Sequence, residues 1–173
     1  MLMLLIVSTF FPFFCTGNAA TSREYEIKAV LLYRLVYYVQ WPDDAFATPD
    51  APIIIGILGE SPFGNEPAKW SKKPIGGREV QLKYYDSPAN VDTCHILFIN
   101  LPQKKNVETL LTGMLTKPVL TVSDSDAFVE KGGMIGFLNV RNHPRLIINN
   151  AAARRARLKI SLELFASSEV FSR

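Results

Sequence analysis

The chain has 173 residues, of which 48% are hydrophobic and 20% charged, a composition typical of one globular domain and not of a disordered segment. The formal net charge of +3 is too small a surplus to predict nucleic-acid binding on electrostatic grounds. No repeat period is visible, which excludes solenoid and propeller architectures.

Residues 1–14 form an apolar stretch without a charged side chain, of the length found in signal peptides. Small residues follow at Gly17, Ala19 and Ala20, so we expect residues 1–20 to be a signal peptide, cleaved near Ala19 or Ala20, and the rest to be periplasmic. No Lys or Arg precedes the apolar stretch, which leaves the α-amino group as its only positive charge or places the true start upstream. A buried N-terminal strand is the alternative interpretation.

The sequence contains two cysteines, and neither predicts an internal disulfide. Cys15 follows Phe13 and Phe14, whereas a lipid-anchored cysteine is preceded by small residues, so no lipoprotein is predicted. Removal of residues 1–20 leaves Cys94 alone in an oxidising compartment. A single thiol on an apolar strand indicates a buried small hydrophobic side chain, with a reactive or intermolecular thiol as the alternative.

The mature chain, residues 21–173, is predicted to open with a helix from about Ser22 to Gln40. Thr21 and Glu24 have the spacing of a capping box. Apolar side chains recur at helical spacing at Tyr25, Ala29, Leu32, Val36 and Val39. Charged residues inside the same segment, Glu24, Glu26, Lys28 and Arg34, exclude a membrane span. Pro42 ends the helix and places Trp41 at its exit.

The remaining elements alternate in a way that predicts an α/β fold. Apolar or alternating runs indicate strands at residues 53–58, 80–84, 94–99, 119–122, 134–140 and 146–148. Helices are predicted at residues 67–71, 106–114, 125–131 and 150–166. The expected architecture is a three-layer α/β/α sandwich with a mostly parallel sheet of about six strands, a C-terminal hairpin and a long terminal helix.

Two short patterns invite a chemical interpretation. Gly59 and Gly64 flank a strand-to-helix turn whose amides could hold an anion, but the Lys-Ser/Thr of a phosphate loop is missing, so a plain tight turn is the alternative. Cys94 and His95 suggest a nucleophile and a base. Neighbours on a strand point to opposite faces, so this pair is not expected to form a catalytic dyad.

Acidic residues follow the fourth predicted strand at Asp124 and Asp126, near the edge where open α/β sheets bind ligands. Such a pair could bind a metal or move a proton, whereas Ser123, Asp124 or Ser125 could instead cap the next helix. An enzyme built on Asp124 and His143 would need these side chains within hydrogen-bond reach. No other acidic or histidine cluster supports a metal.

A basic cluster lies in the last predicted helix, at Arg154, Arg155, Arg157 and Lys159. Helical geometry groups Arg155 with Lys159 and Arg154 with Arg157. The cluster indicates either a solvated helix face or, with Arg145 nearby, a contact surface for an acidic partner.

Several segments in order resemble the YfiR/HmsC-like periplasmic family: EYEIKAVLLYRLVYYVQWP, IGILGESPFG, CHILFI, KPVLTVSDSDAFVEKGGMIGF and LIINNAAARRARLKIS. The resemblance covers most of residues 24–165. It implies a periplasmic repressor that binds the sensor part of an inner-membrane diguanylate cyclase and restrains cyclic di-GMP synthesis and biofilm formation. It also implies sequestration by an outer-membrane-associated lipoprotein, and no catalysis.

The sequence departs from the family pattern at the cysteines. In this family cysteines form stabilising disulfides, but Gly56 stands where the usual partner of Cys94 would be, and the second pair near the final hairpin is absent. Redox control through intramolecular disulfides is therefore not expected here.

The leading hypothesis is a negative regulator, with no cofactor, no metal and no nucleic-acid partner, for which a homodimer is left open. Its candidate contact residues lie near the helix exit and the late hairpin: Trp41, Arg145, Asn149, Arg154 and Arg155. A periplasmic small-ligand sensor for another membrane signalling partner is the alternative. Its candidate residues lie at the carboxyl edge of the sheet: Gly59, Ser61, Ser123 and Asp124.

Overall fold

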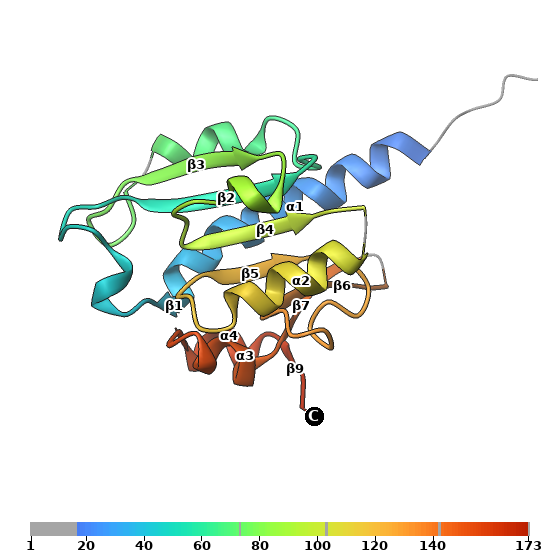
Figure 1. The fold of residues 1–173 in the computed structure, drawn as a ribbon. Helices are drawn as coiled ribbons and strands as arrows, with labels where there is room; N and C mark the ends of the chain where they lie inside the picture. Colours follow the sequence, from blue (N-terminus) through green and yellow to red (C-terminus); the bar gives the residue numbers. More distant parts are fainter. Residues whose placement is uncertain (1–16, 73, 103, 142, 173) are drawn as a thin grey trace, which may run out of the picture.

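The computed structural model describes residues 17–72, 74–102, 104–141 and 143–172 (Figure 1). Most of the predicted signal peptide, residues 1–16, lies outside this range. The first helix, α1, spans Gly17–Tyr38 and so begins earlier than the expected Ser22. The predicted capping box is therefore wrong. Glu24 lies inside the helix, where it pairs with Lys28 one turn later.

A seven-stranded sheet forms the centre of the molecule, with strand order β3-β2-β4-β5-β6-β7-β9. Its strands are β2 (Ile53–Gly59), β3 (Val80–Tyr85), β4 (Ile96–Asn100), β5 (Leu120–Ser123), β6 (Ile135–Val140), β7 (His143–Ile148) and β9 (Glu169–Val170). All neighbours pair in parallel except β6 and β7, which form the predicted antiparallel hairpin. The α/β prediction and its mostly parallel sheet are confirmed.

Helices cover both faces of the sheet, which explains the apolar character of its central strands. On one face α1 packs on side chains such as Ile55 and Phe98, and on the other face α2 (Lys104–Met114) packs on Leu58 and Leu97. Figure 1 shows these two helices on opposite sides of the strands. Short 3-10 helices complete the connections at Asp43–Ala45, Glu66–Lys72 and Pro88–Asn90.

The predicted long terminal helix is wrong. The segment forms two short helices, α3 (Asn150–Arg155) and α4 (Leu162–Ala166), separated by a two-residue strand, β8 (Lys159–Ile160). Arg157 takes a left-handed conformation with φ of 60°, which ends a right-handed helix. β8 then pairs with β1 (Val39–Gln40) at the end of α1, a contact between distant parts of the chain.

The predicted helix at residues 125–131 is also wrong, because this segment forms successive turns. Its amide at Ser125 donates to the Ser123 Oγ at 3.1 Å, which starts a turn in place of a helix. Ala127 adopts a φ of 56°, which interrupts helical geometry at the next step. The hydrogen bond between Ser125 and Ser123 at the end of β5 therefore stabilises a compact loop.

Candidate functional site

The alternative ligand site of the sequence analysis lies at the carboxyl edge of the sheet, where β2, β4 and β5 end side by side. Gly59 has a φ of 88°, and a Cβ there would lie 2.1 Å from the Asn100 carbonyl oxygen. This residue is thus required for close approach of β2 to β4. The Ser61 Oγ is buried and has no hydrogen-bond partner among the described residues.

Ser123 is fully buried at the same edge and serves the fold. Its Oγ donates to the Ile99 carbonyl oxygen at 2.7 Å and accepts from the Ser125 amide. Since these groups satisfy the hydroxyl, Ser123 offers no free donor to a ligand.

Asp124 belongs to a network that joins α1 to the end of β5. Its Oδ2 accepts hydrogen bonds from the Tyr25 hydroxyl at 2.8 Å and from the Lys28 Nζ at 3.1 Å. Lys28, only 6% exposed, also pairs with Glu24 at 2.7 Å, and Asn139 of β6 donates to the other oxygen of Glu24 at 3.1 Å. Burial and the hydrogen bond to Asp124 raise the pKa of Tyr25 to about 12.

Asp124 does not cap a helix, because the segment that follows it forms turns, and its network contains residues that sequence reasoning missed. Tyr25 and Lys28 were assigned to a core helix, although Lys28 shares a helix face with Glu24 and Tyr25 by its i,i+4 and i,i+3 spacing. A lysine beside the buried face of a helix was the available signal, because a buried ammonium needs carboxylate partners.

The enzyme hypotheses lack the contacts that they require. His143 is exposed on β7, and no hydrogen bond joins it to Asp124 in the described part of the chain. Across the described ranges, no group of three or more His, Cys, Asp or Glu residues is arranged to hold a metal ion. The Cys94 thiol is buried, and this burial raises its pKa to about 12, so it is poorly suited to act as a thiolate nucleophile.

His95 is a buried structural residue at the opposite end of the sheet. Its Nδ1 accepts from the Ile54 amide at 2.9 Å, and its Nε2 lies 3.2 Å from the Ala45 carbonyl oxygen, to which it donates as the neutral tautomer. The Phe46 ring stacks on the imidazole with centroids 4.5 Å apart. Burial lowers the pKa of His95, which keeps the ring neutral.

The candidate contact residues of the leading hypothesis divide into two groups. Trp41 is half-buried and donates its Nε1 to the His95 carbonyl oxygen at 3.1 Å, and Asn149 is buried and caps α3 through the Ala152 amide. Arg145, Arg154 and Arg155 are exposed. The two non-basic candidates thus make hydrogen bonds that stabilise the fold, and the three basic candidates lie on the surface.

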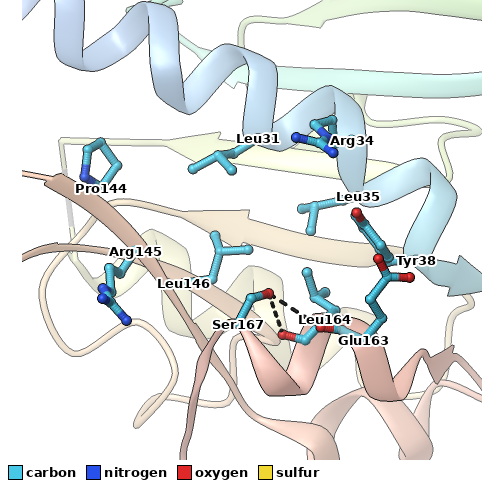
Figure 2. Close-up of a pocket in the computed structure, with 10 residues that line it drawn as sticks. All are labelled: Leu31, Arg34, Leu35, Tyr38, Pro144, Arg145, Leu146, Glu163, Leu164 and Ser167. Atoms are coloured by element: carbon cyan, nitrogen blue, oxygen red, sulfur yellow. Dashed lines mark hydrogen bonds between the residues drawn. The ribbon is translucent and has the colours of Figure 1, made fainter.

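A pocket of about 390 Å³ lies beside Arg145, between α1, β7 and α4 (Figure 2). Its volume falls in the range of natural binding sites. It is lined by Leu31, Arg34, Leu35, Tyr38, Pro144, Arg145, Leu146, Glu163, Leu164 and Ser167. Leucines supply its apolar interior, and charged side chains stand at its rim. Of the basic candidates, Arg145 is the one that lines this pocket.

Comparison with known proteins gives one family. The YfiR/HmsC-like family matches residues 25–168, which include every described strand but the last and all residues that line the pocket. The chain belongs to this family. The resemblance found in the sequence is thereby confirmed, and the family is one of regulatory, non-catalytic periplasmic proteins. No curated protein matches the chain.

In the described part of the chain, the α-helices of this family member range from five to 22 residues in length. Within the described ranges, none is both long and apolar enough to cross a membrane. Helix α1 has the length, but it carries charged residues such as Glu24, Lys28 and Arg34.

Proposed function

We propose that this chain is a periplasmic negative regulator that binds the sensor part of an inner-membrane diguanylate cyclase and restrains cyclic di-GMP synthesis. The observation that carries the proposal is the family match over residues 25–168. The state of the polar groups supports it. Ser123, Asp124 and His95 are engaged in the fold, which leaves them unavailable for chemistry on a substrate.

The proposal includes export and a second partner. Residues 1–20 act as a signal peptide that delivers the chain to the periplasm, as their apolar composition indicates. An outer-membrane-associated lipoprotein sequesters the regulator and releases the cyclase. Reduced cyclic di-GMP lowers biofilm formation.

The test is deletion of the gene in the source organism, with cyclic di-GMP measured in extracts. The deletion raises the level of cyclic di-GMP, and a copy of the full chain returns it to the wild-type level. A copy that lacks residues 1–20 is the matched control, because it makes the same domain without export. Unchanged cyclic di-GMP in the deletion strain, or full complementation by the unexported copy, contradicts the proposal.

A further inference from the structure

The pocket between α1, β7 and α4 has an apolar interior built by distant parts of the chain. Leu35 of α1, Leu146 of β7 and Leu164 of α4 are all at least nine-tenths buried, and Leu31 lies half-buried at the side. Figure 2 shows these side chains converging on one hollow. An apolar side chain that entered the hollow would pack against these leucines and lose its own contact with water, which favours binding.

Two arginines stand on different walls of this pocket. Arg34 comes from α1 and Arg145 from β7, and Figure 2 shows them on either side of the hollow. Both are exposed, and neither has an ion pair or a hydrogen bond within the described part of the chain. By contrast, Arg157 pairs with Asp44 at 2.8 Å. Since Glu163 is the one acidic residue of the lining, the pocket carries a positive surplus.

The pocket continues onto an apolar ridge along the outer face of α1. Ile27, Val30 and Tyr37 are 39%, 47% and 57% exposed. Arg34 lies on the same face between Val30 and Tyr37, and it also lines the pocket, so it joins the ridge to the pocket. The solvent face of a surface helix is ordinarily polar, so three exposed large apolar side chains on one face, with an arginine among them, indicate a contact surface.

We propose that the pocket and the ridge together receive an acidic amphipathic segment of a protein partner. One apolar side chain of the segment enters the leucine-lined pocket, carboxylates beside it bind Arg34 and Arg145, and further apolar side chains cover Ile27 and Val30. Arginine suits this role because its guanidinium donates two parallel hydrogen bonds to one carboxylate. A small molecule in the pocket would leave the ridge exposed, whereas a protein segment covers both.

The inference rests on the proposed function for the identity of the partner, so the probe is the purified periplasmic domain of the source organism's diguanylate cyclase. The full mature chain and its variants are immobilised, and binding is measured by surface plasmon resonance. Arg34→Glu and Arg145→Glu each weaken binding about tenfold or more, and the double variant weakens it about a hundredfold, as reversal of an interfacial charge pair does.

Matched controls separate this surface from general electrostatics. Lys117→Glu makes the same charge change at an exposed position beside α2, on the other face of the sheet and outside the pocket lining, and keeps binding within about threefold. Val30→Ser removes apolar surface without a change of charge and weakens binding about threefold or more. Circular dichroism and thermal unfolding confirm that each variant folds.

The outcomes distinguish this inference from the function on which it rests. If the wild type binds and Lys117→Glu weakens binding as much as Arg34→Glu or Arg145→Glu does, the docking surface is overturned and the regulator proposal is left intact. If the wild type binds and the Arg34→Glu/Arg145→Glu variant binds equally well, the docking surface is likewise overturned and the regulator proposal is left intact. A wild-type chain that does not bind the cyclase domain overturns both.

Discussion

The Tyr25 hydroxyl donates a hydrogen bond to the Asp124 carboxylate at 2.8 Å, although 99 residues separate the two in sequence. The same carboxylate oxygen accepts from Lys28, which is one helical turn beyond Tyr25. A buried ammonium on α1 is thus held by an acid at the end of β5. This contact fixes the first helix of the domain to the sheet, and the wall of the pocket that α1 provides depends on it.

Removal of the Asp124 carboxylate is expected to destabilise the domain. Asp124→Ala leaves the Lys28 side chain, 7% exposed, with Glu24 as its remaining carboxylate, and lowers the free energy of unfolding by about 2 to 4 kcal/mol. Urea denaturation measures the change. Asp44→Ala is the control, because it breaks the exposed pair with Arg157 and costs less than about 1 kcal/mol. Equal losses in the two variants would contradict a special role for the buried network.

His95 is expected to make the stability of the domain pH-dependent. Its Nδ1 accepts from the Ile54 amide only when it is unprotonated, and burial lowers its pKa in the folded state. The unfolded chain then binds more protons than the folded chain below about pH 6.5, so stability falls as the pH is lowered, by at most about 1.4 kcal/mol per pH unit. Stability stops falling once the pH is below the pKa of His95 in the folded chain.

Urea denaturation between pH 5 and pH 8 measures this dependence. His95→Gln removes the titrating group and flattens the profile in this range, while it lowers stability at every pH because the bond to Ile54 changes. His143→Gln replaces the other histidine of the sequence, which is exposed, and is the control. A profile for His95→Gln that is as steep as that of the wild type would rule out this assignment.

We expect that a glycine is needed at position 59 for the pairing of β2 with β4 and not for the binding of an anion. Gly59→Ala places a Cβ 2.1 Å from the Asn100 carbonyl oxygen at a φ of 88°, and costs about 2 to 4 kcal/mol of stability. Gly64→Ala also has a positive φ, of 54°, but its Cβ meets no atom within 4 Å, so it costs about 1 kcal/mol. Thermal unfolding of the wild type and both variants, with and without added phosphate, measures the two stability losses and tests for anion binding. Strong stabilisation of the wild type by phosphate, lost in Gly59→Ala, would favour an anion site.

Gly56 is expected to accept a cysteine that bonds to Cys94. A Cβ at position 56 would lie 3.4 Å from the Cys94 Cβ, near the separation found in disulfides. The same atom would lie 2.8 Å from the Tyr85 ring, so the ring must shift. Oxidised Gly56→Cys, in a chain without residues 1–20, is more stable than Gly56→Ser by about 3 to 4 kcal/mol, the value for closing a loop of this length.

Gly56→Ser is the matched control here, because it crowds Tyr85 to a similar degree without a covalent bond. Mass spectrometry of the unreduced chain detects the bond, and addition of dithiothreitol removes the stability difference. Persistence of two free thiols in the oxidised Gly56→Cys chain would show that Tyr85 holds its place against the new side chain.

Local patterns in the sequence were sufficient for most of the sheet. The continuous apolar run at residues 53–58 predicted β2, which is buried at each of these positions, and Pro42 predicted the end of α1 to within a few residues. The hairpin of β6 and β7 followed from two apolar runs around a turn. These features depend on the periodicity and backbone chemistry of neighbouring residues, which a sequence displays directly.

The tertiary structure decided the features that depend on distant partners. The terminal helix breaks at Arg157 because Lys159 and Ile160 pair with β1, more than a hundred residues earlier. Asp124 is bound by Tyr25 and Lys28 across 99 and 96 residues, and the pocket forms where α1, β7 and α4 meet. A sequence gives the polarity and spacing of such groups. Which of them meet is settled by the packing of helices on the sheet, since hydrogen bonds and buried charges are satisfied only in the folded chain.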